Sequence, residues 1–168
     1  NEMDMIFSTY KDTSIISRYN KGEIVDNKHF VQVFNLSKKI NWESSFAFDP
    51  SVMPLVRYWG FGPDEKPEKV DSNMVDSLRS LVDFFGLKMN EKKPGMELDF
   101  SAIAKGYAVD VVGFVLEKNG IGDYLVEIGG EIKAKGGALQ SDWKIGILSS
   151  VAAKPKPVCD MFDGVIIY

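Results

Sequence analysis

The chain has 168 residues and carries 24 acidic against 20 basic side chains, which gives a formal net charge of −4. This charge argues against a surface built for nucleic-acid phosphates or for an anionic membrane. The hydrophobic content of 45% and the aromatic content of 12% exclude a disordered tail and predict a packed core. The single cysteine and single histidine rule out an intramolecular disulfide and leave any metal ion to oxygen ligands.

The two ends of the chain suggest that it is part of a longer protein. No apolar run approaches the roughly 18 residues of a membrane-spanning helix, and residues 1–10 lack the basic and apolar segments of a signal peptide. The chain begins without Met and ends in the apolar run 164–168, with no turn or polar tail behind it. We therefore expect one domain, residues 1–168, that lacks segments at both ends.

Three segments show the apolar spacing that is typical of helices. Residues 28–40 follow it in part, and residues 74–85 follow it most regularly, with Gly86 as the expected stop. A longer helix is predicted over 102–119, with one apolar stripe formed by Ala104, Ala108, Val111, Val112, Val115 and Leu116.

Short runs of β-branched and aromatic residues predict strands. These runs are Leu87–Met89, Met96–Phe100, Tyr124–Ile128, Ile132–Lys135, Trp143–Leu148 and Val165–Tyr168. Glycine pairs at 129–130 and 136–137 separate neighbouring short strands, which favours antiparallel hairpins or a bulged strand. The predicted fold class is therefore α+β, with a mostly antiparallel sheet packed with helices.

The strongest local signal for chemistry lies where the predicted strand ends at Asp99 and small residues with Lys105 open the long helix. A helix N-terminus presents unpaired backbone N–H groups and a positive dipole end, so it can hold a phosphate. Neither a Walker motif nor a dinucleotide glycine fingerprint is present. The alternative, which the residues alone favour, is a helix start whose small residues only permit close packing, with Lys105 in solvent.

Three other stretches have an unusual composition. Residues 58–63 set three aromatic residues among two glycines, which either stack on a ring or wedge a loop into the core, and we expect the second. Asp49 precedes Pro50, which fits an N-cap followed by proline at the first helical position. Residues 127–131 place two carboxylates around a glycine pair, where either a ligand approaches the backbone or a hairpin turns.

Taken together and in this order, five stretches resemble the FAD:protein FMN transferase family, the ApbE-type flavin transferases formerly described as thiamine-biosynthesis lipoproteins. The resemblance covers essentially the whole chain, and it implies an ApbE-like (T-fold-like) architecture that is incomplete at both ends. The matching residues are Phe7 to Tyr10 with Ser14, Ser17 and Asn20; Ala47 to Pro50 with Pro54 to Val56; Trp59 to Pro63; Leu98 and Asp99 with Ile103 to Asp110; and Ile128 to Glu131 followed by Trp143 to Ile147.

The resemblance implies a Mg²⁺-dependent enzyme that binds FAD and transfers its FMN moiety to a Ser or Thr hydroxyl of an acceptor protein, with release of AMP. Hydrolysis of FAD to FMN and AMP, a flavin-binding lipoprotein without turnover, and a purely structural domain stay open as alternatives. The implied metal ligand is the backbone carbonyl of Ala104. The implied contacts with FAD are Tyr10, Ala47, Phe48, Asp49, Ser101 and Tyr107.

The resemblance also implies a partner and a location. The acceptor would be a subunit of a redox pump or another flavoprotein that carries a Ser or Thr flavinylation site. The parent protein would lie in the periplasm or on the outer face of the cytoplasmic membrane as a lipoprotein, with no role in binding nucleic acid.

The chain departs from the family pattern at several positions. Phe46 stands where a small residue usually precedes Ala-Phe-Asp, Ser101 and Ala102 stand where a glycine pair or similar is common, and Glu131 replaces the more frequent Asp. The family's acidic metal ligands are expected beyond Tyr168. We therefore expect the chain by itself to be inactive.

Overall fold

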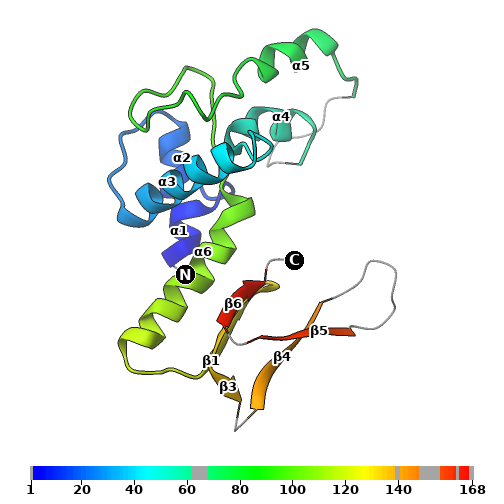
Figure 1. Ribbon diagram of the computed structural model, residues 1–168. Helices are drawn as coiled ribbons and strands as arrows, with labels where there is room; N and C mark the ends of the chain where they lie inside the picture. The colour runs from blue at the N-terminus through cyan, green and yellow to red at the C-terminus, as the bar shows by residue number, and fades with distance from the viewer. Residues whose placement is uncertain (1, 62–67, 139–140, 148–155, 162, 167–168) are drawn as a thin grey trace. The chain divides into compact units, whose positions relative to one another are not determined.

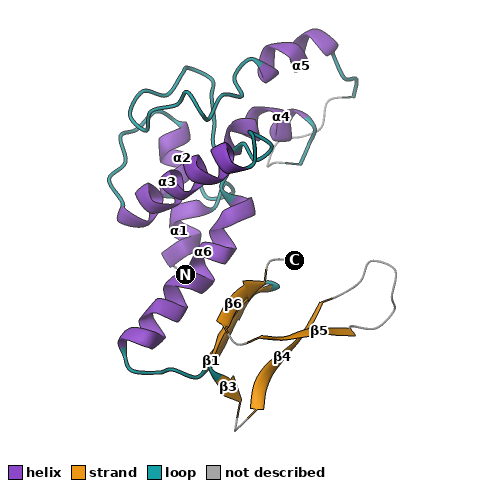
Figure 2. Cartoon of the chain, viewed as in Figure 1, coloured by secondary structure: helices purple, strands orange, loops and turns teal. Residues whose placement is uncertain are grey.

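The computed structural model describes residues 2–61, 68–138, 141–147, 156–161 and 163–166. The chain divides into two compact units, Asn1–Ala104 and Lys105–Tyr168. Among the described residues, the first unit is helical and the second holds the strands (Figure 2). None of the helices in the described ranges is long and apolar enough to cross a membrane.

The first unit is built from short helices around α3 (Figure 1). The side chains of Ser14, Asn27 and Asp71 cap the N-termini of α2, α3 and α5, each by accepting a backbone N–H hydrogen bond. α3 confirms the helix predicted at 28–40 and extends it. The elements are α1 (Glu2–Phe7), α2 (Ile15–Asn20), α3 (Lys28–Glu43), the 3-10 turn η1 (Pro50–Val52), α4 (Met53–Tyr58), α5 (Ser72–Arg79) and the start of α6 (Ser101–Lys118).

Phe100 is the centre of this unit's core. Its ring is fully buried and meets the rings of Phe7, Phe30 and Phe84 edge-on, at centroid distances of 6.2, 5.6 and 6.4 Å. Each such pair stabilises a core by about 0.5–1.5 kcal/mol beyond the buried area. Because Ser101, the first residue of α6, directly follows Phe100, the burial of this ring fixes where the helix begins.

Neither strand predicted in the first unit forms, so both predictions are wrong. At the second of them, Leu98 N–H donates to Asn20 Oδ1 at 2.8 Å, and Leu98 O accepts from Asn20 Nδ2 at 2.9 Å. A buried backbone needs partners for both groups, and here one side-chain amide supplies them. Asn20 therefore takes the place that a neighbouring strand would fill.

The helix predicted over 74–85 is wrong in its second half, because α5 ends well before it. A longer helix would need Asp83 and Phe84 to donate their N–H groups to carbonyls four residues earlier. They donate instead to Ser51 Oγ at 3.0 Å and to Asp49 Oδ2 at 3.2 Å. The side chains of Asp49 and Ser51, at the start of η1, thus accept the hydrogen bonds that helix carbonyls would otherwise accept.

Among its described residues, the second unit combines the rest of α6 with two three-stranded antiparallel sheets (Figure 1). Their orders are β1-β2-β6 and β3-β4-β5. The strands predicted near 124, 132, 143 and 165 are confirmed, although residues 148, 167 and 168 lie outside the described ranges. The strands are β1 (Tyr124–Ile128), β2 (Glu131–Lys135), β3 (Gly137–Ala138), β4 (Ser141–Ile147), β5 (Lys156–Met161) and β6 (Asp163–Ile166).

α6 confirms the predicted long helix but not its predicted buried face. Val109 and Gly113 are buried, whereas Val115, which belongs to the predicted stripe, is 51% exposed. A Cβ at Gly113 would lie only 2.9 Å from Lys133 Cδ and from Tyr124 Oη, so the hairpin packs closely against this face. The helix is apolar on most sides, and apolar spacing alone therefore cannot select the face.

Candidate functional site

Two Asp-x-Ser turns bring together two of the residues predicted to contact FAD, Asp49 and Ser101. In each turn the aspartate Oδ1 accepts from the serine N–H at 2.8 Å and from the serine Oγ at 2.5 Å; the pairs are Asp49 with Ser51 and Asp99 with Ser101. Asp99 N–H also donates to Pro50 O at 2.8 Å and joins the turns. The N-cap role predicted for Asp49 is confirmed at η1.

Hydrogen bonds from three directions hold the predicted segment 47–49. Phe48 N–H donates to Ser44 Oγ at 3.0 Å, and Phe48 O accepts from Asn41 Nδ2 at 2.7 Å. Asp49 Oδ2 accepts from Phe84 N–H at 3.2 Å. Ala47 is exposed, while Phe48 and Asp49 are half-buried. The segment is therefore fixed in place and still reaches the surface.

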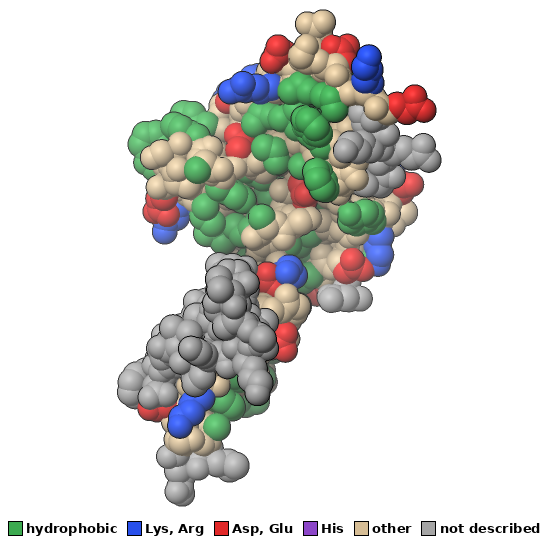
Figure 3. Space-filling view, turned by 90° about the vertical axis from the view of Figure 1, so that its right-hand side faces the viewer, with side chains coloured by type: hydrophobic (Ala, Val, Ile, Leu, Met, Phe, Trp, Pro, Cys, Tyr) green, Lys and Arg blue, Asp and Glu red, His purple; other side chains and the backbone are tan. Residues whose placement is uncertain are grey.

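The backbone before this segment adopts a conformation that glycine favours. Ser45 and Phe46 have φ angles of 52° and 67°. A residue with a Cβ costs roughly 1–2 kcal/mol there, which is a physical reason for the small residue expected at position 46. The half-exposed Phe46 ring offsets part of this cost through contacts with Trp42 and Phe85, at centroid distances of 5.9 and 5.2 Å. Figure 3 shows that hydrophobic side chains also reach the surface elsewhere on the helical first unit.

Serine hydroxyls position Tyr10. Ser8 O accepts from Ser14 Oγ at 2.6 Å and from Ser17 Oγ at 3.4 Å, and Tyr10 N–H donates to Ser8 Oγ at 3.3 Å. The sequence marked Ser14 and Ser17 only as parts of a motif. The structure shows that they hold the turn from which Tyr10 projects, with 72% of its surface exposed.

Tyr10 lines a polar pocket of about 350 Å³. Arg57 Nε lies 3.1 Å from Glu97 Oε2 in this lining, so these two charges are paired. The described lining residues include none of the other predicted contacts with FAD. The sequence predicted a role for Tyr10 alone among these residues. Ser17 and Asn20 belong to a stretch that resembles the family, but no function was predicted for them. The lining residues are Thr9, Tyr10, Asp12, Ser17, Asn20, Lys21, Arg57 and Glu97.

The protein itself caps the N-terminus of α6. Ser101 N–H donates to Asp99 Oδ1 at 2.8 Å, while the N–H groups of Ile103 and Ala104 donate to Phe100 O at 2.9 and 2.8 Å. The expectation of unpaired N–H groups is therefore wrong at these three positions. The Asp99 carboxylate occupies the positive end of the helix dipole, where an anion was expected.

Ala104, the predicted metal ligand, lies in the first turn of α6. Its carbonyl has two lone pairs, and a regular helix uses one of them. Mg²⁺ requires near-octahedral coordination by several oxygen atoms. Within the ranges that the structure describes, no group of three or more His, Cys, Asp or Glu side chains could hold a metal ion. The described residues by themselves therefore do not fit a magnesium site, and Mg²⁺ stays a prediction.

In the second unit, Lys105 is paired with an acid. Its Nζ lies 2.9 Å from Glu131 Oε1 and 3.3 Å from Gly129 O. Gly129 and Gly130 have φ angles of 60° and 101° between β1 and β2, which confirms the hairpin interpretation of this glycine pair. Lys105 is therefore neither an unpaired cation in solvent nor an unpaired cation available to bind phosphate.

Tyr107, the remaining predicted contact with FAD, belongs to the second unit. Its side chain is half-buried, and burial raises the pKa of the phenol. It therefore stays protonated and able to donate a hydrogen bond at neutral pH. Its role toward FAD stays a prediction.

The aromatic stretch after α4 does not wedge into the core, so that expectation is wrong. Phe61 is 78% exposed, and Trp59 is also exposed. Tyr58 is tied to the next helix, because Asp71 N–H donates to Tyr58 Oη at 2.8 Å. Residues 62 and 63 of this stretch lie outside the described ranges.

Comparison with known proteins gives consistent matches over most of the chain. The sequence model of the ApbE family matches residues 1–163. The FAD:protein FMN transferase of Haemophilus influenzae is 36% identical over 156 residues, which are 83% of this chain and 45% of that protein. The corresponding protein of Vibrio cholerae is 34% identical over 159 residues, 87% of this chain and 47% of that protein. The chain thus spans less than half the length of these curated relatives.

Solved structures agree with these matches. The flavin transferase ApbE from Vibrio cholerae superposes with a TM-score of 0.85 at 31% identity, over 98% of this chain and 57% of that chain. An ApbE protein from Thermotoga maritima gives a TM-score of 0.84 at 20% identity, over 97% and 57%, and this likeness supports the fold alone. These structures confirm the predicted ApbE-like fold, and the match of the family model over nearly all residues shows that this chain belongs to the ApbE family.

Proposed function

We propose that this chain is part of an FAD:protein FMN transferase, which transfers FMN from FAD to a Ser or Thr hydroxyl of an acceptor protein and releases AMP. One observation carries the proposal: 31% identity and a TM-score of 0.85 to the flavin transferase ApbE from Vibrio cholerae over 98% of the chain. Phosphoryl transfer depends mostly on positioning and charge, so residues that hold FAD still contribute directly to the reaction.

Within this proposal Tyr10 binds one of the flavin nucleotide's rings by stacking. Its ring is 72% exposed at the edge of its pocket, and the serine network holds its backbone. A stacking contact of this kind contributes on the order of 1 kcal/mol. The pocket would therefore add affinity and orientation, while other groups carry the chemistry.

The two Asp-x-Ser turns, which the hydrogen bond from Asp99 N–H to Pro50 O links, would together position the nucleotide. The Asp49 carboxylate already accepts three hydrogen bonds, so its first role is to fix segment 47–49. Its remaining acceptor capacity suits a ribose or base N–H or O–H group. The Ser101 hydroxyl donates to Asp99 and can therefore act toward FAD only as an acceptor.

The metal, the acceptor and the location rest on the family resemblance. We propose Mg²⁺ as the metal, with Ala104 O as its one ligand from the described residues. The acceptor would be a subunit of a redox pump or another flavoprotein. The full-length protein would be a lipoprotein of the periplasm or the outer face of the cytoplasmic membrane.

The test is to incubate the full-length protein with FAD and Mg²⁺, with and without an acceptor peptide that carries Ser or Thr. Transfer yields AMP together with a fluorescent, flavin-labelled acceptor. AMP without labelled acceptor would identify a pyrophosphatase, and bound flavin without AMP would identify a binding protein. Neither AMP nor bound flavin would refute the proposal.

A matched set of variants tests the pocket. Tyr10→Ala should weaken FAD binding several-fold, and Tyr10→Phe should retain the affinity, because stacking needs the ring and not the hydroxyl. Phe114→Ala is the control, since Phe114 is another exposed aromatic residue and lies on α6. Equal affinity for all three variants would contradict the role of Tyr10.

A further inference from the structure

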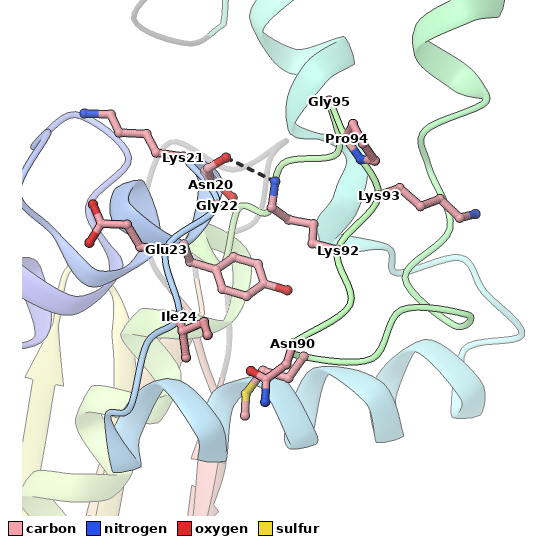
Figure 4. Close-up of a pocket in the computed structure, with 12 residues that line it drawn as sticks. Asn20, Lys21, Gly22, Glu23, Ile24, Asn90, Lys92, Lys93, Pro94 and Gly95 are labelled. Carbon is pink, nitrogen blue, oxygen red and sulfur yellow. Dashed lines mark hydrogen bonds between the residues drawn. The ribbon is translucent and has the colours of Figure 1, made fainter.

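A second pocket of the first unit lies between segment 19–24 and the loop 89–95 (Figure 4). Its volume is about 330 Å³, which falls in the lower part of the range of roughly 300–1,000 Å³ that is usual for ligand sites. It shares Asn20 and Lys21 with the Tyr10 pocket, but Tyr10 does not line it. The proposed transfer of FMN does not use it.

Lys92 brings a partly buried ammonium group to this pocket. Its Nζ donates to Asn20 O at 3.1 Å and to Met96 O at 2.7 Å, and Figure 4 shows the first of these bonds. An ammonium group has three N–H donors, so one is left for another acceptor. Burial lowers the pKa of Lys92, because the charged form loses hydration there. A negatively charged partner would restore that lost stabilisation.

The other charges in the lining leave Lys92 in need of such a partner. Three lysines and one glutamate line the pocket, so the lining carries a net positive charge. Lys21 pairs with Asp12 at 3.1 Å, and Lys93 pairs with Asp83 at 2.6 Å. The glutamate, Glu23, is already paired with an arginine at 2.8 Å. No direct ion pair to Lys92 occurs among the residues that the structure describes. The Glu97 carboxylate acts on it from a longer distance and offsets the effect of burial on the pKa of Lys92 only in part.

Tyr19, another residue of the lining, carries a buried hydroxyl. Its side chain is only 3% exposed, and its Oη has no hydrogen-bond partner within the described part of the chain. An unpaired buried O–H group costs about 1–3 kcal/mol, so proteins seldom retain one without a partner. A ligand atom that accepts a hydrogen bond would remove this cost.

We propose that this pocket binds a small oxyanion, with the Lys92 ammonium and the Tyr19 hydroxyl donating to its oxygen atoms. The two donors belong to a lining of net positive charge, which favours a phosphate or carboxylate group over a neutral ligand. The volume accommodates more than the anionic group itself, so the ligand is a small organic phosphate or carboxylate. The site is separate from the one proposed for FAD.

The experiment titrates the protein with inorganic phosphate and with acetate, against chloride at matched ionic strength, by NMR or calorimetry. Wild type should show saturable binding of at least one of the two oxyanions. Tyr19→Phe should weaken that binding by about fivefold or more, as expected for one hydrogen bond to a charged group, without lowering the melting temperature of the free protein. Lys92→Met should abolish saturable binding, and Lys88→Met, directly before the same loop and outside the lining, should bind as wild type.

Specific results would overturn the proposal. No saturable binding by wild type, or binding that Tyr19→Phe leaves unchanged, would show that the hydroxyl is a structural group. Competition between the oxyanion and FAD would make the pocket an extension of the flavin site, whereas unchanged affinity in the presence of FAD supports a separate site. If Lys92→Met fails to fold, the oxyanion affinities of Tyr19→Phe and Lys88→Met are compared instead, and equal affinities would refute the proposal.

Discussion

The paired Asp-x-Ser turns allow a comparison of two substitutions that differ in one hydrogen bond. Asp49 and Asp99 accept the same two bonds from their serines, at the same distances of 2.8 and 2.5 Å. Asp49 accepts one more, from Phe84 N–H at 3.2 Å. We therefore compare Asp49→Ala with Asp99→Ala.

The expected magnitudes follow from these contacts. Loss of the carboxylate that accepts the serine N–H and O–H at the start of a helical turn costs about 1 kcal/mol in either variant. Asp49→Ala also leaves two buried donors without their acceptor, the Phe84 N–H and the hydroxyl of the fully buried Ser51, whereas Ser101 is exposed; this adds about 1–3 kcal/mol. The free energy of unfolding should therefore fall by about 2–4 kcal/mol for Asp49→Ala and by about 1 kcal/mol for Asp99→Ala.

The assay is urea unfolding followed by circular dichroism at a helix-sensitive wavelength. An unchanged dependence on urea concentration would show that both variants unfold from the same folded state. Equal losses would refute the reasoning, because they would mean that the buried donors of Phe84 and Ser51 gain nothing from Asp49. Binding of FAD to the folded Asp49→Ala variant, measured without urea, then tells whether Asp49 also contacts the ligand. An affinity equal to that of wild type would restrict Asp49 to its structural role.

Three further predictions each concern a single residue. Phe46→Gly should be more stable than Phe46→Ala by about 1 kcal/mol in urea unfolding, because glycine alone removes the cost of the positive φ; equal stabilities would contradict this. Lys105→Gln should leave FAD affinity and its salt dependence unchanged, since Glu131 already neutralises the ammonium, and a marked loss of affinity would restore the phosphate role. Its cost in stability should be about 1–3 kcal/mol, because the Glu131 side chain is only 13% exposed and loses its cationic partner. Burial raises the pKa of Tyr19 from 10.0 to about 12, so the folded state holds its proton more tightly than the unfolded state and stability should fall between these pH values. Tyr19 contributes a slope of up to about 1.4 kcal/mol per pH unit, and pH-dependent unfolding of Tyr19→Phe should lack this contribution.

The site could be predicted from the sequence only in part. The N-cap role of Asp49 and the turn at Gly129–Gly130 were both visible, because each depends on residues next to one another in the chain. The pocket of Tyr10 was not predictable, since Arg57 and Glu97 reach it from distant segments. The partner of Lys105 was hidden for the same reason.

The sequence by itself determined the family, the α+β class, the hairpin of β1 and β2, and the existence of α3 and α6. These features depend on local spacing, turn conformation and motif order, which the sequence states directly. Only the tertiary structure decided that α5 stops early, that Leu98 pairs with a side chain, and that α6 buries its Gly113 face. In each case a hydrogen bond or close contact between distant residues competes with a local preference and is strong enough to override it.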